Sequence, residues 1–86
     1  MRKPFAYEPL LSGKASAFLI GEPRSKQKKI IALAFQLAEH PSQLGDYAIR
    51  EEDGREIQHL LLGDWHFSFW ADHAVRELRI TEITEI

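Results

Sequence analysis

Three strand-like runs joined by short turns fill the C-terminal half of this 86-residue chain, and they constrain its fold more than any other feature. The runs are Arg55–Leu62, Trp65–Trp70 and Val75–Ile83. They are rich in the β-branched, aromatic and long aliphatic residues that favour strands. The turns carry Gly63 and Asp64, then Asp72, residue types that tolerate positive φ or bond to nearby backbone. The sequence therefore predicts an antiparallel meander here.

The N-terminal half predicts two helices between two short strands. We expect a strand at Phe5–Glu8, a helix from its N-cap Ser12 to Gly21, a helix from Glu22-Pro23 to about His40, and a strand at Asp46–Arg50. Pro41 ends the second helix because proline cannot continue it. The predicted order is strand, two helices, then four strands.

The long helix is apolar over a wide arc. At 100° per residue, its apolar residues span roughly 200°; they are Ile30, Ile31, Leu33, Ala34, Phe35, Leu37 and Ala38. Such an arc is too wide for one contact, so one flank should pack on the first helix and the other on the sheet. The sequence thus predicts a single α+β domain over residues 1–86 with two layers: a helical hairpin against an N-terminal strand and a four-stranded antiparallel meander.

The strand Trp65–Trp70 alternates between two kinds of side chain. Trp65, Phe67 and Phe69 point one way, and His66, Ser68 and Trp70 point the other. We expect the aromatic face to meet the helices and the partly polar face to carry the functional site.

The last strand changes parity along its length. Leu78 and Ile80 share one face, whereas Ile83 falls on the other. We therefore expect either a β-bulge near Thr81 or the end of strand pairing there.

Composition excludes several classes of protein. The chain has no cysteine, so it has neither a disulfide framework nor thiolate chemistry. Its four histidines are scattered, and no phosphate loop or metal-ligand spacing occurs, so we expect no metal and no cofactor. No apolar run reaches the ~18 residues of a membrane span, and no signal-peptide core follows the N-terminus. We therefore expect a soluble, cytoplasmic protein.

The net charge of −2 hides an uneven distribution. Residues 1–30 carry +5 and residues 31–86 carry −7. The predicted sheet therefore lacks the basic surplus that is usual on a nucleic-acid-binding face.

Several segments resemble the RelE/ParE superfamily of bacterial toxins. They are Lys26–Ile31, Leu37–Pro41, Gly45–Tyr47, Asp53–Arg55 and Phe69–Ile80. They match a helix ending in Leu-x-x-x-Pro, a Gly-Arg that enters a strand, and an Asp-x-x-x-x-Glu-x-Arg-Ile end. The resemblance extends over about residues 5–86.

The resemblance implies a type II toxin whose partner is an antitoxin. Toxins similar to RelE cut mRNA in the ribosomal A site, and toxins similar to ParE poison DNA gyrase. The expected partners are therefore a cognate antitoxin, together with either the ribosome and mRNA or gyrase.

Three residues are candidates for RNA cleavage, which needs a base, an acid and a cation beside the phosphate. They are His66 for proton transfer and Arg55 and Arg79 for the phosphate. His59 is a candidate to join His66 across the strands. Each has a structural alternative, namely a hydrogen-bonded surface histidine or an ion-paired arginine. We expect Arg76 on the face of the last strand opposite Arg79.

Other side chains are candidates for contact with nucleic acid or for structure alone. Trp70 is a candidate to stack on a base, and Lys26 and Lys29 belong to a basic cluster at the start of the long helix. The alternatives are core packing for Trp70 and ordinary solvation for the lysines. His73 is expected to stabilise the turn between the last two strands.

The sequence departs from the RelE pattern at two places. Glu56, Gln58 and His59 stand where RelE-like toxins carry paired lysines, and the tail over residues 81–86 is acidic. Three alternatives therefore stay open: a non-catalytic ParE-like toxin, a decayed module that only binds antitoxin, and a homodimer formed through the sheet edges.

Overall fold

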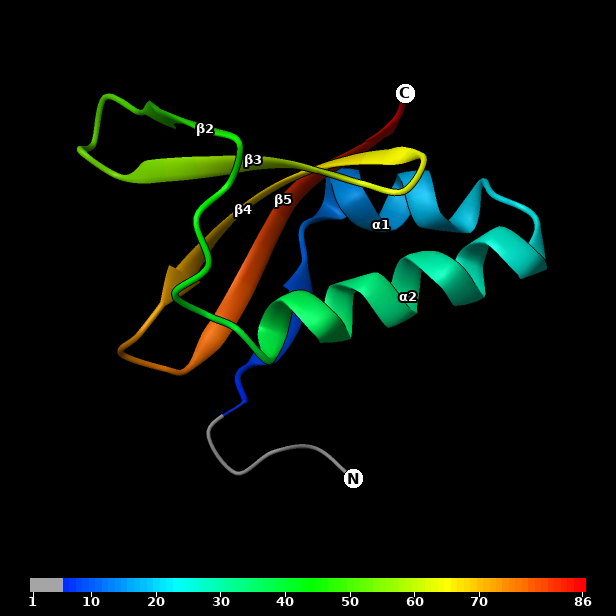
Figure 1. Ribbon diagram of the computed structural model, residues 1–86, viewed down its shortest axis with the longest axis horizontal. Helices are drawn as coiled ribbons and strands as arrows, with labels where there is room; N and C mark the ends of the chain where they lie inside the picture. The colour runs from blue at the N-terminus through cyan, green and yellow to red at the C-terminus, as the bar shows by residue number, and fades with distance from the viewer. Residues whose placement is uncertain (1–5) are drawn as a thin grey trace.

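The computed structural model describes residues 6–86, in which two helices lie against one face of a five-stranded sheet (Figure 1). The elements are β1 Glu8–Leu11, α1 Gly13–Ile20, α2 Arg24–Ala38, β2 Tyr47–Arg50, β3 Glu56–Leu62, β4 Trp65–Asp72 and β5 Glu77–Glu85. The strand order is β1-β5-β4-β3-β2. The predicted two-layer α+β architecture is confirmed.

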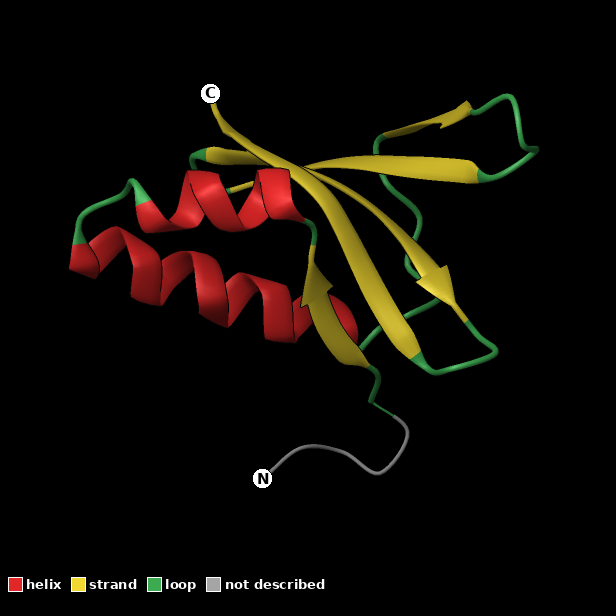
Figure 2. Ribbon diagram, turned by 180° about the vertical axis from the view of Figure 1, so that it is seen from behind, coloured by secondary structure: helices red, strands yellow, loops and turns green. Residues whose placement is uncertain are grey.

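The sheet is mixed. Strands β2 to β5 form the predicted antiparallel meander. Strand β1 adds to its other side and runs parallel to β5 (Figure 2). A parallel pair requires a long connection, and here the chain between β1 and β5 contains both helices and strands β2 to β4.

Two predicted strand boundaries were wrong. Phe5 lies outside the described residues, and the first strand is Glu8–Leu11 rather than Phe5–Glu8. Pro9 is tolerated within it because β1 is an edge strand. The last strand begins at Glu77 because Arg76 has a φ of 57°, a left-handed conformation that interrupts extended backbone. Arg76 therefore lies in the β4–β5 turn and not on a strand face opposite Arg79.

The predicted bulge at Thr81 is confirmed. Ser68 pairs with Glu82 and Phe69 with Ile80, which leaves Thr81 as an extra residue in β5. The extra residue restores the parity of the strand, so Ile83 and Ile80 both reach the core.

The start of α1 is tied to this bulge. The hydroxyl of Ser12 caps the helix by accepting a hydrogen bond from the amide of Ala15 at 3.0 Å, and it donates to the carbonyl of Thr81 at 2.7 Å. The amide of Ser12 donates to the carbonyl of Ile80 at 2.9 Å. One serine thus fixes where the helix begins and which part of β5 it begins against.

Helix α2 buries a narrower stripe than its sequence suggested. Its buried residues are Ile30, Ala34, Leu37 and Ala38. Ile31 and Phe35 are each 42% exposed, because α2 packs on β1, β5 and α1 with one side only. Among residues 6–86 neither helix is both long and apolar enough to cross a bilayer.

The core lies between the helices and the predicted aromatic face of β4. Trp65, Phe67 and Phe69 are buried there, as the alternation indicated. The helices cover the β1–β5 side, while the β2–β3 hairpin extends beyond them (Figure 1). The connection from α2 to β2 meets this hairpin at Gly45, where an added Cβ would lie 2.4 Å from the carbonyl oxygen of His59.

Replacing Ser12 with alanine is expected to lower the free energy of unfolding by about 1 to 2 kcal/mol, because the cap and the bond to Thr81 are both lost. Chemical denaturation measures the change. The matched control is Ser16→Ala inside α1, which should be neutral or slightly stabilising because alanine is the better helix former. Equal losses of unfolding free energy in both variants would show that the hydrogen bonds of the Ser12 hydroxyl contribute no extra stability.

Gly45→Ala is expected to destabilise the protein by about 1 to 3 kcal/mol, because the added methyl collides with the backbone of β3. Gly13→Ala is the control, since an added Cβ there meets nothing within 4 Å. Thermal unfolding of the two variants tests the prediction. A Gly45→Ala protein as stable as the Gly13→Ala protein would contradict the close approach.

Candidate functional site

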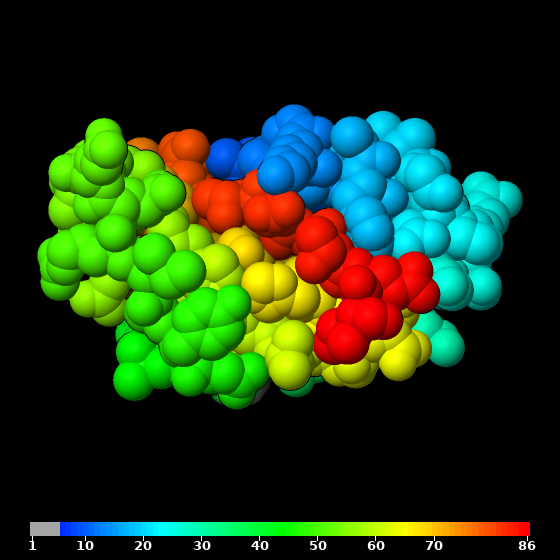
Figure 3. Space-filling view, turned by 90° about the horizontal axis from the view of Figure 1, so that it is seen from above, coloured from blue at the N-terminus to red at the C-terminus, as the bar shows by residue number. Residues whose placement is uncertain are grey.

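The sheet face that the helices leave uncovered carries most of the predicted site residues. Figure 3 looks onto this outer face, where β2 to β5 lie side by side from green to red and the start of α1 borders β5. Pairing places Tyr47 opposite His59, His59 opposite Ser68 and Trp70 opposite Arg79. The outer face is thus partly polar, as the alternation in β4 predicted.

Three aromatic rings form a row across β2, β3 and β4. The rings of Tyr47 and His59 stack with centroids 4.6 Å apart and planes within 3°. The Nδ1 atom of His59 lies 3.1 Å from the Nε2 atom of His66. His59 is therefore held between a phenol ring and a second imidazole, and it does join His66 across the strands.

Ser68 completes this cluster, which we call the histidine pair site and define as Tyr47, His59, His66 and Ser68. Ser68 is only 3% exposed, and its hydroxyl lies 3.2 Å from Nδ1 of His59. Nδ1 carries either a proton or a lone pair. With the proton, His59 donates to His66 or Ser68; without it, His59 accepts from one of them. In the contact between Nδ1 of His59 and Nε2 of His66, either imidazole can therefore be the donor.

The surroundings of the His59 side chain favour its neutral form. Burial lowers the pKa of His59 below its ordinary value, the neighbouring His66 lowers it further, and Glu82 acts in the opposite direction. A neutral imidazole at physiological pH is able to accept a proton. His59 is thus held in the neutral form that can accept a proton, a role that the sequence had pointed to in His66.

A hollow of about 370 Å³ opens beside the pair site. His59 and Ser68 line it from the sheet, and Lys14 and Glu82 line it from the α1 side. The ammonium of Lys14 lies 3.1 Å from the carboxylate of Glu82. Among residues 6–86, the one lysine or arginine that lines this hollow is therefore already paired with an acid.

The two predicted arginines lie together but away from His66. Arg55 covers the ring of Trp70 with its guanidinium 4.0 Å from the centroid, and Arg79 approaches the same ring at 5.6 Å. Trp70 is four residues from His66 along β4, a distance of about 13 Å in an extended strand. The structure brings Arg55, Arg79 and Trp70 together and leaves His66 with His59.

Each arginine in this group has a carboxylate partner. Arg55 pairs with Asp53 at 3.4 Å, and Arg79 pairs with Asp72 at 3.3 Å and with Glu77 at 2.9 Å. The ion-paired alternative that the sequence left open for these arginines describes the observed contacts. A phosphate bound here has to compete with these acids.

The predicted lysines are not on the outer face. Lys26 and Lys29 belong to α2, which packs on the other side of the sheet. Lys26 pairs with Glu85 at 3.3 Å. They do not form one surface with Trp70.

Sequence reasoning missed Tyr47 as a member of the site. Its position in a short strand was predicted, but its contact with His59 depends on the β2–β3 register, which alternation alone does not give. His73 lies in the predicted turn, where its Nδ1 atom forms a 2.8 Å hydrogen bond with the hydroxyl of Tyr7. Within residues 6–86 no three metal-ligating side chains gather into a site.

No protein-family model matches the chain, and no curated protein matches its sequence. Solved structures do match its fold. A chain of the RelBE2 toxin–antitoxin complex from Mycobacterium tuberculosis superposes with a TM-score of 0.78 at 17% identity, and the match covers 100% of this chain and 98% of that one. The chain has a RelE-like fold.

Two further solved structures match the same fold. A chain of the archaeal RelE–RelB complex from Pyrococcus horikoshii OT3 gives a TM-score of 0.69 at 11% identity, covering 93% of this chain and 94% of that one. A chain of the intact E. coli RelBE toxin–antitoxin complex gives 0.60 at 9% identity, covering 94% and 98%. The RelE-like fold predicted from the sequence is confirmed, whereas such low identities say nothing about individual side chains.

The free energy of unfolding is expected to fall as pH drops from about 7.5 to 5.5. The unfolded chain protonates His59 at its ordinary pKa of about 6.5, whereas the native protein resists until a lower pH. The stability is therefore complete above about pH 6.5 and is lost as pH falls through the lower native pKa. Urea titrations at a series of pH values measure this slope.

His59→Gln should flatten the slope between pH 7.5 and 5.5. The control is His40→Gln, because His40 is an exposed histidine at the end of α2 and lies outside the pair site. A slope that is the same in wild type and His59→Gln would rule out His59 as its source.

Proposed function

We propose that this chain is the toxin of a type II toxin–antitoxin pair, held inactive by a cognate antitoxin, and that the free toxin cleaves mRNA on the ribosome. The observation that carries the proposal is the match of the whole chain to whole chains from three RelBE complexes. The same likeness supports an antitoxin as partner, because all three structures are of RelBE complexes. A cytoplasmic location follows from the proposed target.

The histidine pair site is the proposed centre of catalysis. His59 takes the proton of the ribose 2′-hydroxyl, the 2′-oxygen attacks the phosphorus, and the bond to the 5′-oxygen breaks. His66 gives a proton to that leaving oxygen. This assignment extends the sequence-based role of His66 to its neighbour His59, which the 3.1 Å contact supports.

The remaining predicted residues have roles at a distance from the cleaved bond. Arg55 and Arg79 hold phosphates farther along the RNA, about 13 Å from His66. Trp70 stacks on a base once Arg55 leaves its ring. Lys26 and Lys29 contact a separate segment of nucleic acid from the helical side.

A second candidate function is a non-catalytic toxin that acts on gyrase, or a module that only binds antitoxin. The paired state of Lys14, Arg55 and Arg79 favours it, since no lysine or arginine of the described residues 6–86 at the histidine pair site or beside Trp70 is free of an acid. Unpaired cations are what a phosphate-binding surface needs.

Induced expression in a bacterium is expected to arrest growth, and co-expression of the small protein encoded beside this gene should relieve the arrest. Primer extension should show mRNA cut within codons on ribosomes. His59→Ala and His66→Ala should each slow cleavage about 10²- to 10⁴-fold, as is usual for the loss of an acid or base. Arg55→Ala and Arg79→Ala should cost less, because they contact only flanking phosphates.

The control is Ser25→Ala on the exposed side of α2, which leaves the histidine pair site and the Arg55–Arg79–Trp70 group untouched and should arrest growth like wild type. Arrest without mRNA cleavage, unchanged in the His59 and His66 variants, would overturn the nuclease mechanism. Inhibition of gyrase supercoiling by purified protein would then assign the ParE-like alternative. Tight antitoxin binding without any arrest would assign the decayed module.

A further inference from the structure

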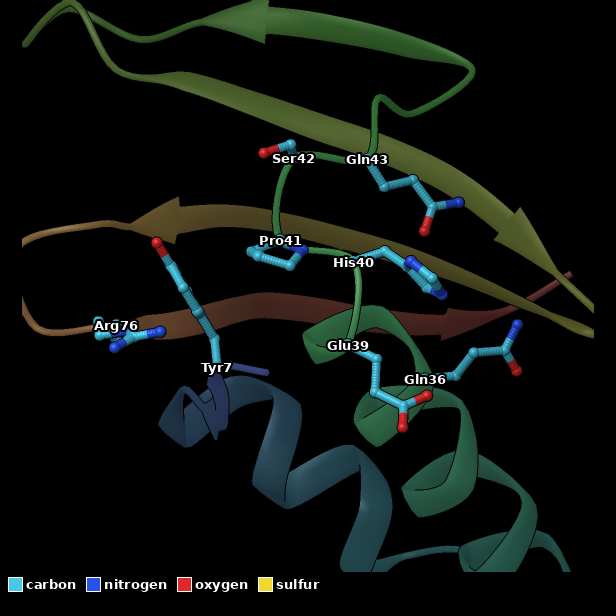
Figure 4. A pocket seen from close by; sticks show the side chains of 8 residues that line it. All are labelled: Tyr7, Gln36, Glu39, His40, Pro41, Ser42, Gln43 and Arg76. Atoms are coloured by element: carbon cyan, nitrogen blue, oxygen red, sulfur yellow. The ribbon is translucent and has the colours of Figure 1, made fainter. Parts of the chain in front are cut away.

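A second hollow, of about 790 Å³, opens at the C-terminal end of α2, and it shares no residue with the histidine pair site. Tyr7 and Arg76 line it on one side, and Glu39 and His40 line it where α2 ends (Figure 4). Its volume lies within the range of small-molecule sites.

Tyr7 is fixed in place at the floor of this hollow. Its amide donates to the carbonyl of Ala38 at 2.9 Å. Its hydroxyl forms the 2.8 Å hydrogen bond with Nδ1 of His73. The backbone of Tyr7 is therefore anchored to α2, and its hydroxyl is anchored to the β4–β5 turn.

Arg76 is held above this ring in a conformation that arginine rarely adopts. Its guanidinium carbon lies 5.7 Å from the centroid of Tyr7. Its φ of 57° is left-handed, and its carbonyl accepts the amide of Glu8 at 3.1 Å. Strained backbone of this kind concentrates at binding sites.

The guanidinium of Arg76 has no acidic partner. Among residues 6–86 no carboxylate lies within 4.0 Å of it, whereas Arg50, Arg55 and Arg79 are all paired. Residues 1–5 contain no acidic residue at all. A cation of this kind, aimed at a hollow, is ready to bind an anion.

Glu39 supplies the opposite charge at the same hollow. Its side chain forms no ion pair with any part of the chain that the structure describes, including Arg76. In the view of Figure 4 the two charged side chains lie on either side of Tyr7. The hollow thus presents an unpaired cation and an unpaired anion that do not reach each other. A ligand that suits both has an anionic group and, some distance away, hydrogen-bond donors.

We propose that this hollow binds a guanine nucleotide, with the phosphate on Arg76 and the base on Glu39. Guanidinium binds phosphate through two parallel hydrogen bonds. A carboxylate accepts hydrogen bonds only, and guanine presents two adjacent donors, N1–H and the N2 amino group, on its Watson–Crick edge. Adenine offers one donor beside an acceptor, which the carboxylate repels. His40, exposed at the rim, supplies a ring on which the base stacks.

A free mononucleotide and a guanosine within RNA present the same chemistry to this hollow. The proposal does not depend on the toxin function, because it concerns binding by the purified chain at a separate place. Loss of growth arrest therefore bears on the proposed function alone, and loss of binding bears on this site alone.

The test is calorimetric titration of the purified chain with guanosine 5′-monophosphate, adenosine 5′-monophosphate and a short oligonucleotide that contains one guanosine. The guanine nucleotide is expected to bind about tenfold or more tightly than the adenine nucleotide. Binding of the mononucleotide identifies a free nucleotide as ligand. Binding of the oligonucleotide alone identifies a guanosine within RNA.

Two variants test the charge of Arg76 and the charge of Glu39 separately. Arg76→Gly removes the guanidinium but adopts a φ of 57° without strain, so the protein should keep its fold while affinity falls about 10- to 100-fold. Glu39→Gln should keep phosphate binding and lose the preference for guanine. The control is Arg24→Gln, which removes the same charge from the start of α2 and should bind like wild type.

Three results would overturn the proposal. They are equal affinity for the guanine and adenine nucleotides, unchanged affinity in Arg76→Gly, and tighter binding of triglycine than of any nucleotide. The last would assign the hollow to a peptide terminus, whose carboxylate and ammonium suit the same two charges.

Discussion

The extra residue at Thr81 is the constraint on which the arrangement of the two layers depends. Without it, the two halves of β5 would present their apolar residues to opposite faces, and Ile83 would leave the core that Ile80 shares. The bulge also exposes a carbonyl to which the cap of α1 is bonded through Ser12. The same irregularity therefore sets the face of the last strand and the start of the first helix. A helix docked elsewhere on β5 would lose the hydrogen bond from Ser12 to Thr81 and its contact with the core.

Alternation and turn chemistry were enough to predict the layers, the meander and the bulge, because each depends on the order of apolar and polar residues in one segment. Strand boundaries near Tyr7 and Arg76 were not predictable in the same way. The conformation of Arg76 is decided by bonds to β1, which lies far away in the sequence. The strand propensity of a local segment does not depend on a hydrogen-bond partner that is distant in the sequence.

The candidate site, too, was predictable from local pattern only in part. The polar face of β4 followed from its pattern, but the row of Tyr47, His59 and His66 requires the registers of two strand pairs. Arg55, Arg79 and His66 were grouped by chemistry, and the structure separates them along β4 because side chains on one face of a strand can still lie far apart. Arg55 and Arg79 are also less available to a phosphate, because acids from their own turn and strands already pair with them.

A shared fold and a shared chemistry are separate claims for this chain. The backbone arrangement matches RelE-like structures from end to end, yet lysines are missing from β3, where His59 stands instead. The two imidazoles lie in contact on a face where Lys14, Arg55 and Arg79 are already paired with acids. If RNA is cut here, proton transfer has to supply more of the catalysis and charge stabilisation less. The pair site and the paired arginines are therefore two consequences of one acidic surface.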